Sequence, residues 1–330
     1  MKISVISSGS WGTAIAILLA ENGHDITLWS FSQEECDALL THKENHKFLP
    51  GFPIPKSVSH TSDISRLAGA DMAVSALPSF AVRKIMREYA PYAAPVIVNL
   101  SKGLEGGSLA TLSTVIKEEI PTAEVAVMSG PSHAEEVAKK IPTTNVVAAP
   151  NTEVANFIQD AFMNPYFRVY TNPDITGVEL GGSLKNAIAL CAGISDGLGF
   201  GDNTKAALMT RGMYEITRLG TALGARAETF GGLSGMGDLI VTCTSMHSRN
   251  RRAGILIGQG KTPAEAEAEV KMVVEGINTC RVAKHLADKL GVEMPIINAA
   301  YEVLFNNKPA KEATMELMGR GKRSESEYLT

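Results

Sequence analysis

The chain has 330 residues, of which 45% are hydrophobic and 20% charged, which is ordinary for a globular protein of about two domains. Its formal net charge of -4 argues against nucleic acids and anionic membranes as partners. The four cysteines are widely spaced and form no metal-ligand or disulfide pattern, so we expect no metal and a reducing, cytoplasmic location. We expect no membrane span, because no apolar run approaches about 20 residues.

Short apolar runs alternate with helical segments in the first half of the chain. This alternation predicts a mainly parallel, Rossmann-type sheet with helices on both faces. The segment His42–Lys56 contains three prolines and is expected to form a surface loop. The expected strands are Ile3–Ile6, Asp25–Trp29, Met72–Leu77, Pro95–Leu100, Val125–Ser129 and Asn145–Ala148, with a first helix at Trp11–Asn22.

Between the first strand and helix lies Ser7-Ser8-Gly9-Ser10-Trp11-Gly12, where α/β proteins carry the dinucleotide fingerprint G-x-G-x-x-G. Gly9 would let a pyrophosphate approach the backbone, and Gly12 would let the helix pack closely on the strand. Ser7 stands at the first glycine position, where a positive φ would cost serine free energy that glycine avoids. The pattern predicts dinucleotide binding, and the alternative is a turn that is merely tight.

The choice between NAD and NADP depends on residues after the second strand. An acidic residue there would bind the ribose of NAD, and an arginine would bind the NADP phosphate. The segment after Trp29 reads Ser-Phe-Ser-Gln and has neither. Phe31 would stack on the adenine or belong to the core, and the residues leave both interpretations open.

Helical spacing replaces strand-like runs beyond about residue 175. We therefore expect a dinucleotide-binding domain over residues 1–175 and an all-α domain over residues 176–330. Thr262 and Pro263 are a typical helix start. The expected helices include Leu184–Ile194, Thr204–Leu219, Pro263–Met272, Cys280–Lys289 and Ile296–Phe305.

Polar groups in glycine-rich or apolar surroundings are the candidate site residues. Lys102 follows a strand at the sheet edge where α/β folds bind ligands. Lys185 begins an otherwise apolar helix, and Arg249 lies in a donor-rich cluster suited to a phosphate. Each also has an ordinary interpretation: either lysine as a surface group, the arginine cluster as a solvated helix face, and Asp238 as a helix cap.

Together these segments resemble the NAD(P)-dependent glycerol-3-phosphate dehydrogenases, most closely the bacterial form, over nearly the whole chain. The matching motifs are Gly9–Ala14, Asn99–Glu105, Ser129–Glu136, Phe167–Tyr170, Leu184–Asn186, Asp196–Gly199, Gly237–Val241, His247–Asn250, Val274–Gly276 and Met294–Pro295.

The resemblance implies reversible hydride transfer between NAD(P)H and dihydroxyacetone phosphate, giving the sn-glycerol 3-phosphate that starts phospholipid synthesis. Lys185 would exchange the proton of the C2 oxygen, which near neutral pH requires a lowered pKa. Lys102 would hold that oxygen and stabilise its developing charge. Asp238 and Thr242 would orient Lys185.

The resemblance also implies which residues contact the ligands. Substrate contacts would come from Lys102, Gly130, Ser132, Lys185, Asn186, Asp238, Ser248, Arg249 and Asn250. Cofactor contacts would come from Gly9, Ser10, Trp11, Gly12, Phe31, Lys102, Ala134, Arg249, Val273 and Glu275. Bacterial relatives often carry basic residues where Phe31 and Ser32 stand here, whereas a phenylalanine resembles the NAD-specific eukaryotic branch. We therefore favour NAD and leave NADP open. A homodimer is likewise left open.

Two rival hypotheses remain. A hydroxyacyl-CoA or ketopantoate type of dehydrogenase would carry a His–Glu pair or a different lysine context. A non-catalytic nucleotide sensor would bind NADH without turnover, and Ser7 would then mark a decayed cofactor site.

Overall fold

The computed structural model describes residues 1–322 and 324–325, which divide into two compact units. The first contains Met1–Lys102 and Ala110–Val178, and the second contains Gly103–Leu109 and the chain from Glu179 onward. The division thus falls three residues beyond the expected boundary after residue 175, and one loop of the first half groups with the second unit. None of the described helices combines the length and the apolar character that a membrane span requires.

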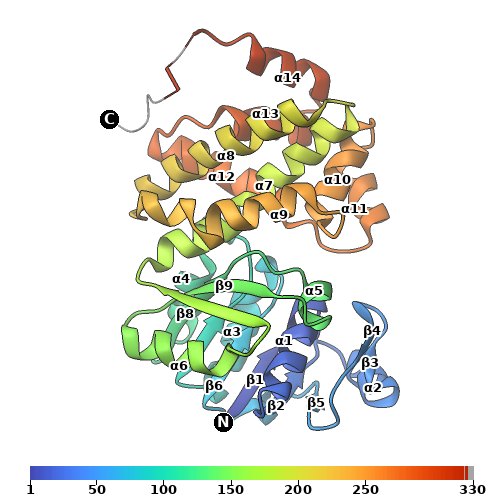
Figure 1. Cartoon of the computed structure of the whole chain (residues 1–330), viewed down its shortest axis with the longest axis vertical. Helices are drawn as coiled ribbons and strands as arrows, with labels where there is room; N and C mark the ends of the chain where they lie inside the picture. The colour runs from blue at the N-terminus through green and yellow to red at the C-terminus, as the bar shows by residue number, and fades with distance from the viewer. Residues whose placement is uncertain (323, 326–330) are drawn as a thin grey trace. The chain divides into compact units, whose positions relative to one another are not determined.

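A single eight-stranded sheet forms the centre of the first unit, in the order β10-β9-β8-β7-β6-β1-β2-β5 (Figure 1). Neighbouring strands are parallel except β8 and β9. All six predicted strands are present; the three-residue β5 and the six-residue β10, at the two ends of the sheet, were not predicted. The bounds are β1 Lys2–Ile6, β2 Asp25–Trp29, β5 Ser59–Thr61, β6 Met72–Ser75, β7 Val96–Asn99, β8 Glu124–Ser129, β9 Thr143–Ala148 and β10 Phe167–Asn172.

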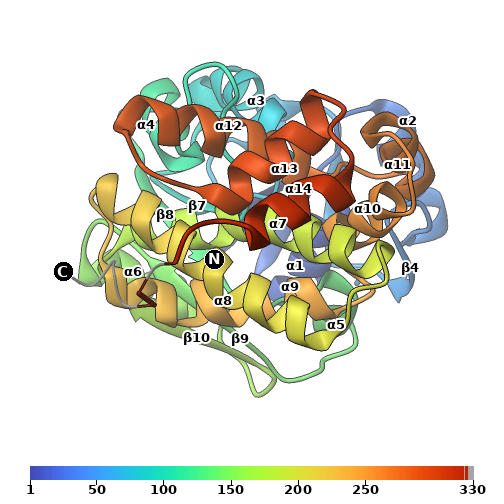
Figure 2. The same ribbon diagram turned by 90° about the horizontal axis from the view of Figure 1, so that it is seen from above.

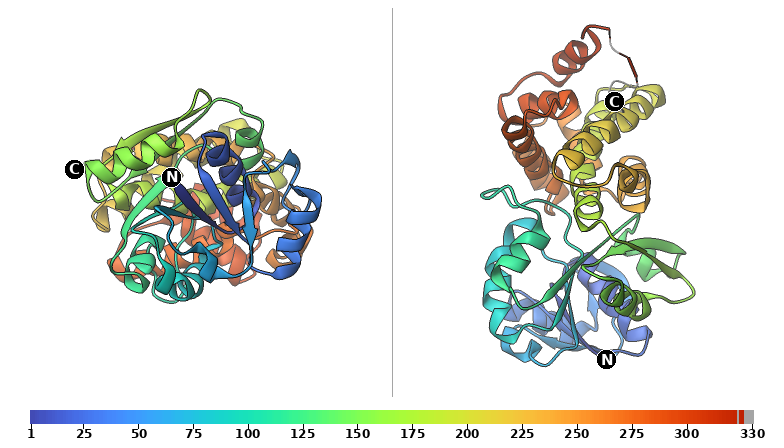
Figure 3. Two further views of the ribbon diagram at one scale, coloured as in Figure 1. Left: turned by 90° about the horizontal axis from the view of Figure 1, so that it is seen from below. Right: turned by 90° about the vertical axis from the view of Figure 1, so that its left-hand side faces the viewer.

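Helices cover both faces of this sheet, and alternate side chains of each central strand enter two different cores. Val5 of β1 packs on the face that carries α1, α5 and α6, and Ile6 packs on the face that carries α3 and α4. Figure 3 shows the strands from below, with helices on either side. The bounds are α1 Ser10–Glu21, α2 Gln33–His42, α3 Val82–Tyr89, α4 Leu112–Glu119, α5 Ala134–Ala138 and α6 Thr152–Phe162.

The prediction of a surface loop over His42–Lys56 was wrong in part, because this segment contains an antiparallel hairpin. Strands β3 (Glu44–Asn45) and β4 (Leu49–Pro53) pair within it. Leu49 is fully buried in the core on the α1 side of the sheet. The prolines are compatible with a strand because this two-stranded sheet leaves the outer edge of β4 without a ladder partner.

The second unit is helical (Figure 2). Its helix α7 is buried at every position from Gly181 to Ser195. This helix begins at Ile175 rather than at Leu184, so Gly181 and Gly182 lie within it. A Cβ at Gly181 would lie 2.9 Å from the carbonyl oxygen of Ser234, so glycine is required there for close packing. The bounds are α7 Ile175–Gly197, α8 Asp202–Ala222, α9 Asp238–Thr244, α10 Arg249–Gly258, α11 Pro263–Val270, α12 Glu275–Leu290, α13 Pro295–Phe305 and α14 Ala310–Met318.

Helices α7 and α10 touch through their backbones. A Cβ at Gly193 would lie 2.1 Å from the carbonyl oxygen of Arg251, and one at Gly254 would lie 2.1 Å from that of Leu190. Gly197 is equally close, at 2.2 Å from the carbonyl oxygen of Ile255. Since real Cβ atoms do not approach backbone oxygens so closely, any side chain here would push the two helices apart.

All four cysteines are buried, and none forms a disulfide. Cys36 lies in the first unit, and the other three belong to the core of the helical unit. Burial raises the pKa of Cys243 and Cys280 to about 12, because a thiolate would be desolvated there. The thiols are therefore protonated, apolar core side chains at neutral pH.

A buried carboxyl group caps α13 from a neighbouring helix. Glu215 of α8 is 4% exposed and accepts the backbone N–H groups of Ile296 at 2.7 Å and Ile297 at 3.2 Å. Burial raises the pKa of Glu215 to about 7, against the lowering effect of these two hydrogen bonds. Because the folded pKa lies above the ordinary value of 4.5, protonation of Glu215 favours the folded state.

Glu215→Gln should remove this pH dependence. The stabilisation from Glu215 is fully present below about pH 4.5 and is lost as the pH rises through about 7. Between pH 5 and 8 the wild-type protein should therefore lose about 2 to 3 kcal/mol of unfolding free energy relative to the variant. Urea unfolding of both proteins at four pH values measures the difference. Parallel stability curves would contradict the raised pKa.

Candidate functional site

The turn between β1 and α1 has the geometry of a phosphate cradle. Gly9 is the N-cap residue of α1, and Ser10 and Trp11 lie in its first turn. A Cβ at Gly12 would lie 1.9 Å from the carbonyl oxygen of Ser7, so only glycine allows this approach of helix to strand. The N–H groups at the start of a 12-residue helix can donate hydrogen bonds to an anion, and these residues therefore fit a dinucleotide pyrophosphate.

Ser7 has a φ of +115°, as the fingerprint position predicts. A residue with a Cβ is strained in this region, typically by about 1 to 3 kcal/mol. The Ser7 hydroxyl also accepts the N–H of Gly9 at 3.2 Å. One of the backbone donors of the cradle is thus already engaged within the turn.

Beyond the buried Ser30, the chain after β2 is partly to fully exposed and leads into an acidic helix start. The Phe31 side chain is 68% exposed and meets the Trp29 ring edge-on, with 6.3 Å between centroids, so it is not a core residue. Ser32 caps α2 by accepting the N–H of Glu35 at 3.2 Å. Glu34 and Glu35 occupy the first turn of that helix.

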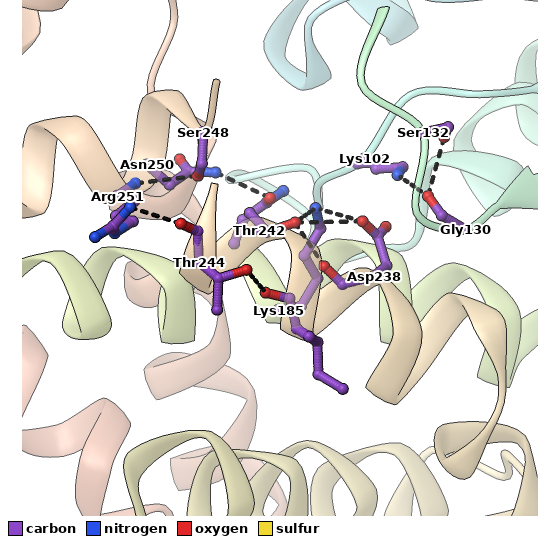
Figure 4. A network of polar contacts seen from close by, with 12 residues as sticks. Lys102, Gly130, Ser132, Lys185, Asp238, Thr242, Thr244, Ser248, Asn250 and Arg251 are labelled. Carbon is purple, nitrogen blue, oxygen red and sulfur yellow. Dashed lines mark hydrogen bonds and ion pairs between the residues drawn. The ribbon is translucent and has the colours of Figure 1, made fainter. Parts of the chain in front are cut away.

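Three predicted substrate contacts of the first unit meet at one carbonyl oxygen (Figure 4). The Lys102 ammonium and the Ser132 hydroxyl both donate to the carbonyl oxygen of Gly130, each at 3.0 Å. Gly130 has a φ of +151°, which suits glycine. Ala134, predicted to contact the cofactor, is buried at the start of α5.

Asn145 is a residue of this region that the sequence analysis did not select. It is 1% exposed, and neither end of its amide finds a hydrogen-bond partner within the part of the chain that the structure describes. A Cβ at Gly130 would lie 2.3 Å from its Oδ1, so Asn145 excludes any larger residue at that turn. A lone asparagine within the apolar run of β9 was the available signal.

The helical unit holds Lys185 in a buried ion pair (Figure 4). Its ammonium donates to Oδ1 of Asp238 at 3.0 Å and to the hydroxyl of Thr242 at 2.6 Å. All three residues are at most 5% exposed. The Thr242 hydroxyl in turn donates to the carbonyl oxygen of Asp238 at 2.6 Å, which fixes its orientation. The two acceptors hold the Lys185 ammonium in one orientation, so the arrangement presents an oriented lysine.

A separate set of amide hydrogen bonds begins at Asn186, the neighbour of Lys185 in the chain. Asn250 donates to Oδ1 of Asn186 at 2.9 Å and accepts the N–H of Gly276 at 2.8 Å. These contacts join α7, α10 and α12. Both asparagines were predicted as substrate contacts, and their pairing adds a structural role that spacing alone did not reveal.

The start of α10 carries the remaining donors. Ser248 is its N-cap and accepts the N–H of Arg251 at 3.2 Å. The Arg249 guanidinium donates to the carbonyl oxygen of Val273 at 3.2 Å, so two predicted cofactor contacts of this unit lie together. Glu275 begins α12 two residues beyond Val273. Across the described residues, His, Cys, Asp and Glu form no cluster of three or more suited to a metal.

Both halves of the chain match models of one protein family. Residues 2–155 match the N-terminus of NAD-dependent glycerol-3-phosphate dehydrogenase, and residues 174–315 match its C-terminus. The curated glycerol-3-phosphate dehydrogenase [NAD(P)+] of Agathobacter rectalis is 52% identical over 331 residues, covering 99% of this chain and 98% of that protein.

Solved structures agree with this assignment. The crystal structure of glycerol-3-phosphate dehydrogenase from Coxiella burnetii aligns with a TM-score of 0.94 at 36% identity, covering 97% of this chain and 99% of that one. A PanE/ApbA family ketopantoate reductase from Ralstonia eutropha covers 95% of this chain, but at 16% identity and a TM-score of 0.62 it shares the fold alone. The chain belongs to the NAD-dependent glycerol-3-phosphate dehydrogenase family.

Proposed function

We propose that this protein reduces dihydroxyacetone phosphate to sn-glycerol 3-phosphate with NADH or NADPH, in support of phospholipid synthesis. The observation that carries the proposal is the Lys185 ammonium, buried and aligned by Asp238 and Thr242. The nicotinamide supplies the hydride when it is bound. The reaction then needs one proton at the carbonyl oxygen, and Lys185 is the group that would deliver it.

Reduction of the ketone requires a proton donor, and Lys185 can fill this role. In ketone reduction the carbonyl carbon gains a hydride, and its oxygen gains a proton from the Lys185 ammonium. The neutral amine then recovers a proton from solvent. Asp238 stabilises the ammonium before the transfer, and Thr242 limits its rotation. Because oxidation is the reverse of this step, the same residue would accept the proton there.

Phosphate recognition is proposed for the start of α10. This ten-residue helix begins with backbone N–H groups and the Arg249 guanidinium, and both suit a phosphate dianion. Asn250 and Ser248 are proposed to assist, although both side chains also have structural hydrogen bonds. Lys102, Gly130, Ser132 and Asn186 stay predicted substrate contacts, and Val273 and Glu275 stay predicted cofactor contacts.

We favour NAD as the cofactor. The exposed Phe31 ring is available for an adenine, and no basic residue follows it directly. Glu34 in the first turn of α2 would repel the extra phosphate of NADP, whereas the charge of Glu35 is offset by Lys47 at 2.9 Å. The proposed reaction uses no metal and no nucleic acid. The four unpaired cysteines favour the cytoplasm as the compartment.

The first test is the loss of NADH or NADPH absorbance that depends on dihydroxyacetone phosphate. We expect turnover, with a kcat/KM for NADH above that for NADPH because of the acidic first turn of α2. Ketopantoate and an acetoacetyl-CoA substrate serve as controls for the rival dehydrogenases. Binding of NADH without turnover of any of these substrates would favour the sensor hypothesis.

Lys185→Met should lower kcat by about a hundredfold or more, because it removes the proton donor. The substitution leaves Asp238 as a buried, uncompensated charge, so the double variant Lys185→Met/Asp238→Asn should be measured beside it. Both should still bind NADH in a fluorescence titration.

Lys205→Met is the matched control for this experiment. Lys205 also forms a lysine–aspartate ion pair in the helical unit, at 2.8 Å from Asp196, but lies outside the Lys185 network. Its kcat should stay within about threefold of the wild-type value, as expected for a residue that does not touch the reacting atoms. Near-normal turnover of both Lys185 variants would remove Lys185 from the mechanism.

Ser7→Gly should tighten NADH binding several-fold and stabilise the protein. Glycine relieves the strain at φ +115° and frees the N–H of Gly9 for the pyrophosphate. Ser7→Ala separates the two effects, because it frees the same N–H but keeps the strain. Fluorescence titration gives the affinity, and thermal unfolding gives the stability. An unchanged Kd in both variants would show that Ser7 does not limit cofactor binding.

A further inference from the structure

A buried side chain outside the fingerprint fixes the turn of the cradle. Asn45 lies in β3 and is 4% exposed. Its amide donates to the carbonyl oxygen of Ser8 at 2.7 Å and to the hydroxyl of Thr13 at 2.8 Å. One residue of the hairpin is thus bonded on both sides of Gly9 to Gly12, the segment proposed to receive the pyrophosphate.

These contacts form a closed ring. The Thr13 hydroxyl accepts from Asn45 and donates to the same carbonyl oxygen of Ser8, at 3.2 Å. Ser8 is 5% exposed and Thr13 is fully buried, so water does not readily replace any of the three bonds. The Ser8 carbonyl therefore has two donors that hold it in one orientation.

Asn45 itself has no freedom to turn away. Its Oδ1 accepts the N–H of Phe48 at 3.1 Å, and its backbone is paired with Leu49. Leu49 is fully buried in the core beside α1. The hairpin is anchored by this leucine, and the anchored hairpin positions the amide against the turn.

The turn needs such support because Ser7 is strained. A serine at φ +115° tends to relax toward a more favourable conformation, and strained residues persist only where their surroundings determine the backbone. Relaxation of Ser7 would move the Ser8 peptide, which is the group that Asn45 and Thr13 hold.

We propose that Asn45 is a positioning residue for the dinucleotide. It does not touch the cofactor; it holds the turn Ser7–Gly12 in the conformation that binds the pyrophosphate. This inference rests on the proposed function, since it requires that the turn receives a dinucleotide. A purely structural role for Asn45 would lower stability but leave the affinity for dinucleotides unchanged.

The test compares Asn45→Ala with Asn22→Ala. Asn22 caps the other end of α1, and its amide likewise donates to two backbone carbonyl oxygens, those of Ala161 at 2.9 Å and Phe162 at 3.2 Å. Both variants lose comparable hydrogen bonds, but only Asn45 touches the cradle. The probes are NADH, by fluorescence titration, and ADP-ribose, by calorimetry, because ADP-ribose contains the pyrophosphate and lacks the nicotinamide.

Asn45→Ala should raise the Kd for both probes by about the same factor, on the order of tenfold, whereas Asn22→Ala should leave both within about twofold. Thr13→Val, which breaks the ring from the helix side, should weaken binding in the same way and provides a second variant if Asn45→Ala does not fold. In a Ser7→Gly background the effect of Asn45→Ala should be smaller, because glycine is not strained at that φ.

Unchanged Kd values in folded Asn45→Ala and Thr13→Val would overturn the proposal, as would equal weakening by Asn22→Ala. A wild-type protein that binds neither NADH nor ADP-ribose would instead contradict the proposed function. The two failures are therefore distinguishable.

Discussion

A charged lysine in the most deeply buried helix is the constraint on which the helical unit depends. Lys185 is 5% exposed, and an ammonium so far from water is tolerated only with a counter-charge and further acceptors. Asp238 and Thr242 provide them from α9. The position of α9 against α7 is therefore set by electrostatics as well as by apolar packing.

Glycines make the contact between α7 and α10 equally specific. Backbone contact at Gly193 and Gly254 leaves no room for α10 to slide, because any shift would bring a side chain against a carbonyl group. The same contact brings Asn250 to Asn186 and so fixes the start of α10, where phosphate recognition is proposed. The apolar helix is thus held by two kinds of interaction, one polar and one steric.

The first unit follows a different principle, since its proposed binding element is a strained turn supported from outside. The strand and helix around the turn could be predicted from periodicity, and the strain at Ser7 could be predicted from its place in the fingerprint. The role of Asn45 could not be predicted, because its contacts join the turn to a hairpin. The three prolines of that segment predicted a loop instead. Spacing within one segment carries no information about such long-range bonds.

The same limit applies in the helical unit. Lys185, Asp238 and Thr242 could be selected from the resemblance, but their hydrogen-bond pattern required coordinates. In the sequence, Glu215 cannot be distinguished from the other polar residues of an amphipathic helix, yet it caps α13 from across the core. The sequence shows that a lysine in an apolar helix is unusual, but only the fold shows which residues meet it and which polar residues act across the core.

The buried cysteines have a consequence for how the protein withstands oxidants. Thiol reagents react with exposed thiolates, and burial suppresses both exposure and ionisation at Cys243 and Cys280. Alkylation of these sulfurs must wait until the helical core opens. The rate of alkylation therefore reports the opening equilibrium of that core, and anything that holds the core closed also protects its thiols.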